Sequence, residues 1–173
     1  RGIITYGVNL IYGNGIKKNK KEGLRYLKIG CEKGLTEAMF YYSVAILEDK
    51  ITSSTELNEA IKYMKIAIEH NHTKAMNMYG VFLLRGQNVE RNIEQAMHYL
   101  KMAADRGDLD SLMTYFSLTY ENDISNELSD KIIDEFSKML YDKNPNALFV
   151  FGRFYLKVAK NVSKAIMYFK IGA

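Results

Sequence analysis

The sequence predicts an all-α protein, an α-solenoid of about five antiparallel helix hairpins with a period of 36–37 residues. One short sequence motif recurs at Tyr26, Tyr63 and Tyr99, which are 37 and 36 residues apart. Weaker copies begin at Phe136 and Tyr168. A single proline among 173 residues, of which 47% are hydrophobic, favours helix throughout. A fixed period of this size is typical of small units that bury their apolar faces by stacking on one another.

The first half of each repeat predicts one helix. The five repeats can be aligned on one position each, and an aromatic residue stands immediately before that position in all five. In four of the repeats a small residue stands five positions before the aligned position. Offsets of −5, −1 and +3 from the aligned position share one helix face, so a second helix is expected to approach closely there. The large side chain of Phe116 is expected to displace a neighbour or occupy a pocket, and to perturb its helix locally. The aligned positions are Gly7, Ser43, Gly80, Phe116 and Gly152.

The second half of each repeat predicts the partner helix. Alanine stands three residues before the recurring tyrosine at Ala60, Ala96 and Ala165, and Gly23 takes this place in the first repeat. Glycine and asparagine in the segments 13–15 and 86–88 favour tight turns between the two helices. Each second helix is followed by a residue that tolerates the left-handed conformation: Gly34, Asn71, Gly107 and Asn144.

These boundaries divide the chain into one solenoid domain of five repeats. Because the chain begins without methionine and ends inside the repeated pattern, we expect it to be part of a longer protein. The predicted repeats cover residues 1–36, 37–73, 74–109, 110–145 and 146–173.

Composition disfavours several classes of function. The formal net charge of +4 is spread along the chain, whereas a nucleic-acid binder more often gathers Lys and Arg on one face. No segment approaches the ~20 apolar residues of a membrane helix. Cys31 is the only cysteine, which rules out an intrachain disulfide and a zinc site built from cysteines. The cellular compartment stays open.

The third repeat carries a pattern that resembles the Sel-one-like repeat (SLR) family. The other repeats match it well or in part, so the resemblance covers nearly the whole chain. The residues that carry it are Tyr79-Gly80, Leu83, Gly86-Gln87-Asn88-Val89, Ala96, Tyr99 and Ala103-Ala104-Asp105-Arg106-Gly107. The resemblance implies a right-handed superhelix of hairpins related to tetratricopeptide repeats, and a role as a scaffold or adaptor that binds proteins or peptides.

In related solenoids the first helix of each repeat lines the concave face, which defines a candidate binding groove. Offsets −6, −3, +1, +4 and +5 then face a ligand and give an apolar stripe beside charged residues, which suits a helical or extended peptide. Because offset +4 is apolar in all repeats, we expect it to pack between hairpins, which favours offsets −3 and +1 as contacts. The predicted partner-binding residues are Phe40, Val44, Lys74, Asn77, Val81, Arg85, Asp110, Met113, Ser117, Phe149 and Arg153.

Other chemistry-bearing residues have simpler interpretations. His70 and His72 stand two apart and can share a metal, but exposed polar residues at a helix end are the more common explanation. Asp108 and Asp110 precede a helix, where carboxylates cap free amides. Cys31 is expected to be buried rather than nucleophilic. No catalytic residue, cofactor site or metal site is predicted.

The main hypothesis is therefore a non-enzymatic scaffold that holds a protein or peptide segment in its concave groove. The alternative is a structural segment that associates with itself through its end hairpins. A metal-dependent or catalytic domain is a third hypothesis, which rests on His70 and His72 alone.

Overall fold

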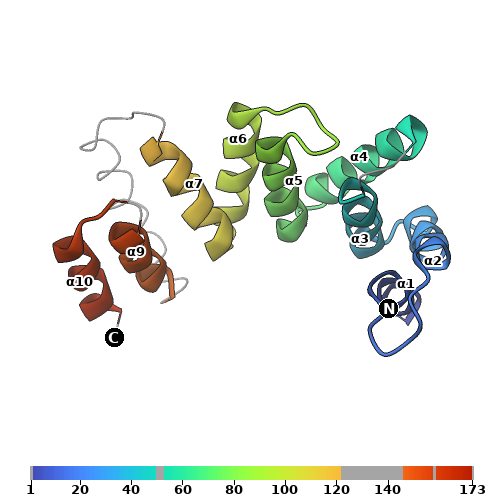
Figure 1. Ribbon diagram of the computed structural model, residues 1–173, viewed down its shortest axis with the longest axis horizontal. Coiled ribbons are helices and arrows are strands. Elements are labelled where there is room, and N and C mark those ends of the chain that lie inside the picture. The colour runs from blue at the N-terminus through green and yellow to red at the C-terminus, as the bar shows by residue number, and fades with distance from the viewer. Residues whose placement is uncertain (1, 50–52, 122–145, 158, 173) are drawn as a thin grey trace. The chain divides into compact units, whose positions relative to one another are not determined.

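The computed structural model describes residues 2–49, 53–121, 146–157 and 159–172. Over these residues the chain forms nine α-helices and no strands (Figure 1). The predicted all-α helical repeat fold is confirmed. None of the described helices has both the length and the apolar character required to span a membrane. Contacts divide the chain into two compact units, Arg1–Ala96 and Met97–Ala173, which are described in turn.

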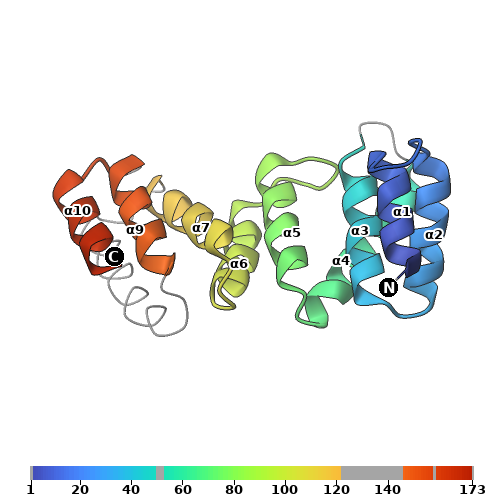
Figure 2. The same cartoon turned by 90° about the horizontal axis from the view of Figure 1, so that it is seen from below.

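The first compact unit is built from helix pairs. Helix α1 (Gly2–Tyr12) packs on α2 (Lys20–Glu32), and α3 (Thr36–Leu47) packs on α4 (Ser54–Glu69) (Figures 1 and 2). Helix α5 (Thr73–Arg85) follows, and α6 (Ile93–Ala104) begins at the end of this unit. Helix α3 contacts both α1 and α5, so the first helices of three successive repeats are neighbours.

Small residues set the distance within each pair. A Cβ atom added to Gly23 of α2 would lie 2.6 Å from the carbonyl oxygen of Gly7 and 2.6 Å from Cγ1 of Ile11. In the next pair the Ser43 hydroxyl donates a hydrogen bond of 2.7 Å to the carbonyl oxygen of Ala60, and both residues are fully buried. The close approach predicted from the aligned small residues is therefore confirmed in both hairpins.

Side chains cap the second helices of these hairpins. The Asn19 side chain accepts a hydrogen bond from the Glu22 amide at the start of α2. At the start of α4, Ser53 and Glu56 form a reciprocal capping box. Asn71 ends α4 with a φ of 60°, in the left-handed region predicted for it.

The turn after α5 reaches back to the preceding repeat. The Asn88 amide donates to the carbonyl oxygens of Leu47 at 3.0 Å and Asp49 at 2.6 Å. The Gln87 amide also donates to Leu47, at 3.3 Å. The last carbonyls of a helix lack partners within the helix, so these side chains satisfy the end of α3. The sequence predicts this turn only as a connection between two helices. Its side-chain hydrogen bonds also link the third repeat to the second.

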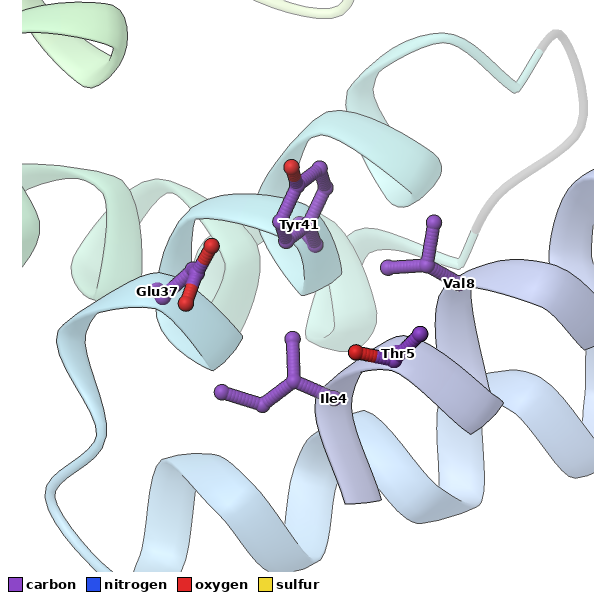
Figure 3. A pocket seen from close by; sticks show the side chains of 5 residues that line it. All are labelled: Ile4, Thr5, Val8, Glu37 and Tyr41. Atoms are coloured by element: carbon purple, nitrogen blue, oxygen red, sulfur yellow. The ribbon is translucent and has the colours of Figure 1, made fainter. Parts of the chain in front are cut away.

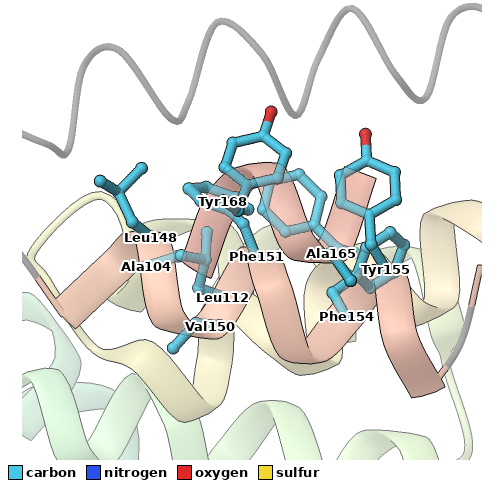
Figure 4. Close-up of a cluster of buried hydrophobic side chains, with 10 residues drawn as sticks. Ala104, Leu112, Leu148, Val150, Phe151, Phe154, Tyr155, Ala165 and Tyr168 are labelled. Carbon is cyan, nitrogen blue, oxygen red and sulfur yellow. The ribbon is translucent and has the colours of Figure 1, made fainter. Parts of the chain in front are cut away.

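The second compact unit has an aromatic core. It contains α7 (Leu109–Glu121), α9 (Asn146–Lys157) and α10 (Val162–Ile171). The Phe116 ring lies 5.5 Å from Phe151 and 6.0 Å from Phe154 of α9. The Tyr155 and Tyr168 rings of the same cluster stack at 5.4 Å (Figure 4). Phe116 is buried in this cluster and α7 continues through it, so the predicted local perturbation is wrong. The large side chain fills a space between two first helices.

Part of the fourth repeat lies outside the described residues. This includes its expected second helix around Phe136 and the residue Asn144 expected to end that helix. The five repeat boundaries drawn from the sequence stay predictions.

Candidate functional site

A hollow of about 410 Å³ lies between α1 and α3 (Figure 3). Ile4 and Val8 of α1 form its apolar wall, and Thr5 stands exposed at the edge. From α3, the exposed carboxylate of Glu37 and the half-buried ring of Tyr41 complete the lining. The hollow therefore combines an apolar wall, an aromatic ring and one negative charge.

A second hollow, of about 180 Å³, lies between α3 and α5. Glu37 and Tyr41 line this hollow as well, so the two hollows adjoin at these side chains. Together they form what we call the α1–α3–α5 groove, which crosses the first helices of three repeats. Its residues are Ile4, Thr5, Val8, Glu37, Phe40, Tyr41, His72, Thr73 and Lys74.

The predicted binding residues of the first compact unit are only partly on this groove. Phe40 and Lys74 line it. Phe40 is 7% exposed, and its ring packs 4.8 Å from the ring of His72, so it contributes to the floor. Val44 is also buried, at 6%. The remaining predicted residues lie elsewhere on α5, half-buried at Asn77 and Val81 and exposed at Arg85.

In the second compact unit the predicted residues are divided between α7 and α9. Asp110, Phe149 and Arg153 are exposed, and Phe149 packs on the Phe169 ring at 5.5 Å. Two more, Met113 and Ser117, are half-buried on α7, where the Ser117 hydroxyl donates to the Met113 carbonyl oxygen. Their role in binding stays a prediction.

Sequence reasoning missed Tyr41, which lines both hollows together with Glu37. Tyr41 has offset −2, whereas the predicted groove used offsets −6, −3, +1, +4 and +5. The missed signal is the run Phe40-Tyr41-Tyr42. Three consecutive aromatic residues point in directions about 100° apart on a helix, so they cannot all face one core. One of them had to lie at the surface.

His72 joins the groove to the start of α5. Its Nδ1 accepts a hydrogen bond of 3.2 Å from the Ala75 amide and so caps the helix. Burial lowers the pKa of His72, and the nearby Lys74 ammonium acts in the same direction, whereas the Glu37 carboxylate raises it. The cap requires a neutral ring, because a protonated Nδ1 has no lone pair to accept with.

The two histidines have separate partners. Nδ1 of His70 lies 3.0 Å from the Thr36 hydroxyl, whereas Nδ1 of His72 bonds to the amide of its own helix. Among the residues that the structure describes, no three or more His, Cys, Asp or Glu side chains are grouped as metal ligands. Both histidines stand at helix ends, His70 as the C-cap of α4 and His72 as the N-cap of α5, but only His70 is exposed as predicted.

The remaining candidates have structural roles. Cys31 is 3% exposed, and burial is the main cause that raises the pKa of its thiol to about 12. The thiol is therefore protonated and unreactive at neutral pH. Asp108 accepts a hydrogen bond of 2.7 Å from the Ser111 amide, and Asp110 stands in the first turn of α7. Both predictions, a buried cysteine and a carboxylate cap, are confirmed.

A polar cluster connects the hairpins on the side of α2 and α4. The Tyr42 hydroxyl donates to Oε2 of Glu59 at 2.9 Å, and the Lys28 ammonium lies 3.0 Å from the same oxygen. Burial, and then this hydrogen bond, raise the pKa of Tyr42. All three side chains line a hollow of about 430 Å³. Because these side chains satisfy one another's hydrogen-bonding groups, the cluster stabilises the contact between repeats.

Successive helix hairpins with a constant period define the class as a helical repeat protein. The model of the Sel1 repeat family matches residues 6–35, 36–72, 73–108 and 148–173. The chain belongs to the Sel1 repeat family, and the resemblance drawn from the sequence is confirmed. Proteins of this family generally act as scaffolds for protein interactions and are typically non-catalytic.

Two solved structures share the fold. A Sel1 repeat protein from Oxalobacter formigenes superposes with a TM-score of 0.66 at 19% identity, covering 98% of this chain and 71% of that one. The protective antigen c5321 of uropathogenic Escherichia coli, which has an SLR fold, gives 0.62 at 17% identity. That match covers 97% of this chain but only 44% of the antigen. A comparison with curated proteins found no match.

We expect the capping role of His72 to make stability depend on pH. Its pKa in the folded chain lies below that of an unfolded histidine, about 6.5. Its contribution is therefore fully present above about pH 6.5 and is lost as the pH falls through the folded-state pKa. His72→Asn keeps a capping side chain and removes the titration, so its free energy of unfolding should stay within about 1 kcal/mol of wild type at pH 7.5.

Urea unfolding of both proteins at pH 7.5 and pH 5 measures the difference. Wild type should lose more stability than His72→Asn on acidification. His98→Asn, at an exposed position, is the matched control and should behave like wild type. Equal pH dependence in wild type and His72→Asn would contradict this role.

Proposed function

We propose that this chain is a non-catalytic scaffold that binds a segment of a partner protein in the α1–α3–α5 groove. The observation that carries the proposal is the pair of adjoining hollows across three successive first helices. Each hollow has apolar or aromatic walls and a charged edge. An elongated surface of this kind suits a peptide segment that makes several small contacts in a row.

The two hollows differ in size. Pockets for small molecules usually enclose about 300–1,000 Å³; the hollow between α1 and α3, at about 410 Å³, lies within this range, whereas the hollow between α3 and α5, at about 180 Å³, is smaller. It suits a single side chain. Neighbouring helices pack about 8–10 Å apart, so a segment that crosses α1, α3 and α5 places side chains several residues apart in the two hollows.

Tyr41 is the proposed anchor of this interaction. Its ring is shared by both hollows and is half-buried. Tyrosine offers a large, stiff contact surface with one polar end, and such residues often dominate binding energy at interfaces. The Phe40 ring lies 5.0 Å from the Tyr41 ring and packs in turn on the His72 ring at the floor of the groove.

The other residues predicted from the sequence extend the proposed surface. On α5 they would contact parts of the segment beyond the two hollows, and on α7 and α9 they form a separate contact surface of the second compact unit. Val44 of α3 is buried and would support the surface from beneath. The other further proposed residues are Asn77, Val81, Arg85, Asp110, Met113, Ser117, Phe149 and Arg153.

Binding can be tested without a known partner by selecting from a displayed library of random dodecapeptides. Tyr41→Ala should weaken binding of the selected peptides about tenfold or more, because truncating an aromatic anchor costs over about 1 kcal/mol. Fluorescence anisotropy with labelled peptides measures the change. Val8→Asp, on the facing helix, provides a second variant should Tyr41→Ala alter the circular dichroism spectrum.

Lys65→Ala, at an exposed position of α4, is the control and should leave affinity unchanged. Undiminished binding by both Tyr41→Ala and Val8→Asp would show that this groove is not the binding site.

Self-association is a second candidate, favoured by the apolar face of α10. Ile166 and Ile171 are 47% and 52% exposed, whereas the aligned Ile61 and Ile66 of α4 are half-buried. A free face of this kind can stack on another copy of the chain. Light scattering should then show a mass that rises with concentration, and Ile166→Glu should suppress the rise. A concentration-independent mass of 19.9 kDa would contradict this candidate.

A further inference from the structure

Two of the three helices that line the groove differ in charge: α3 is acidic at both of its ends, and α5 is basic at both of its ends. Helix α3 has Glu37 in its first turn, and Glu48 follows its last residue. Helix α5 has Lys74 near its start and Arg85 at its end. All four side chains are exposed. A ligand that crosses from α3 to α5 therefore moves from an acidic helix to a basic one.

Glu37 and Lys74 hold the central charges of this pattern. Both line the hollow between α3 and α5, with the His72 ring in the same lining. The four ion pairs found among the described residues involve other side chains. The carboxylate and the ammonium are thus available to a ligand at the edge of an otherwise aromatic hollow.

Spacing links these two charges to the ligand's own sequence. Because α3 and α5 are packed neighbours, their axes lie about 8–10 Å apart. An extended chain advances about 3.3 Å per residue and points alternate side chains to the same face, so two side chains that flank a third on one face are four residues, or about 13 Å, apart. Such a pair is long enough to reach from α3 to α5 with the middle side chain between the two helices. The hollow between the two charges is lined by the rings of Phe40, Tyr41 and His72, which favours an apolar side chain at that point.

We propose that the segment bound in the groove is zwitterionic, with a basic side chain against Glu37 and an acidic side chain against Lys74, about four residues apart in an extended backbone. An apolar side chain between them enters the hollow beside Tyr41. This inference rests on the proposed function and adds the chemistry of the partner. It selects against uniformly charged segments, because an all-basic or all-acidic peptide brings like charges together at one of the two helices.

The charges contribute specificity more than affinity. An exposed ion pair changes affinity by no more than about fivefold, and complementary charges at the rim mainly fix register and exclude wrong partners. The apolar contact at Tyr41 then supplies most of the binding. The two contributions can therefore be separated by experiment.

The test repeats the dodecapeptide selection with charge-exchanged variants. Wild type should enrich peptides with a basic and an acidic residue about four apart, in either order, because the segment can run in either direction. Glu37→Lys should enrich acidic peptides that lack the basic residue, and Lys74→Glu should enrich basic ones. The double variant, with both charges exchanged, should again select a zwitterionic pair. Lys62→Glu, at an exposed position of α4, is the matched control and should keep the wild-type preference.

A selected peptide then supports a double-mutant cycle by fluorescence anisotropy. Replacing its basic residue with glutamine should weaken binding to wild type about three- to fivefold at low salt, and should cause no further loss with Glu37→Gln. Circular dichroism verifies that each exposed-site variant retains its helix content.

The outcomes separate this inference from the proposed function. Apolar or singly charged peptides that bind wild type and lose affinity with Tyr41→Ala would leave the groove in place and overturn the charge pattern. Absence of any enrichment, or enrichment that is insensitive to Tyr41→Ala, would overturn both.

Discussion

The structure depends on the close approach of the two helices in each hairpin. Where α1 meets α2, neither Gly7 nor Gly23 has a side chain, and a Cβ on Gly23 would clash with backbone. In the next hairpin the same contact is made by Ser43 and Ala60 through a direct hydrogen bond. Close backbones make each hairpin a unit with a defined shape, so successive hairpins can stack with their first helices adjacent. The α1–α3–α5 groove exists because three such helices lie in a row.

The features that the sequence predicts well are those that repeat. The period, the paired helices, the left-handed residue Asn71 and the cap at Asp108 all follow from local rules. Features that depend on one repeat meeting the next are predicted less well. The turn at Asn88 shows this, because nothing local indicates that its amide reaches carbonyls about 40 residues earlier.

The difference between repeated features and contacts between repeats also explains why the candidate site was predicted only in part. Lys74, chosen by its offset, lines the hollow between α3 and α5, and its role in binding stays a prediction. The offsets, however, treated every first helix alike. Helix α3 packs against α1, α2, α4 and α5, so Phe40 and Val44 are buried at offsets expected to face a ligand. Offset +4 behaves as predicted at Ile11 and Leu47, which are buried, whereas Leu156 is 46% exposed. A periodic pattern identifies a helix face, but the neighbours decide how much of that face remains open.

The central claim is that paired small residues, rather than helix propensity, fix the geometry of the hairpins. Gly23→Ala tests it most directly, by urea denaturation followed by circular dichroism. Alanine favours helix over glycine by about 1 kcal/mol, so propensity alone predicts a more stable protein. Close approach predicts instead a loss of about 1–3 kcal/mol, because α1 and α2 must move apart. Gly2→Ala, where an added Cβ meets nothing within 4 Å, should cause no loss. A Gly23→Ala protein as stable as wild type, or more stable, would contradict the account.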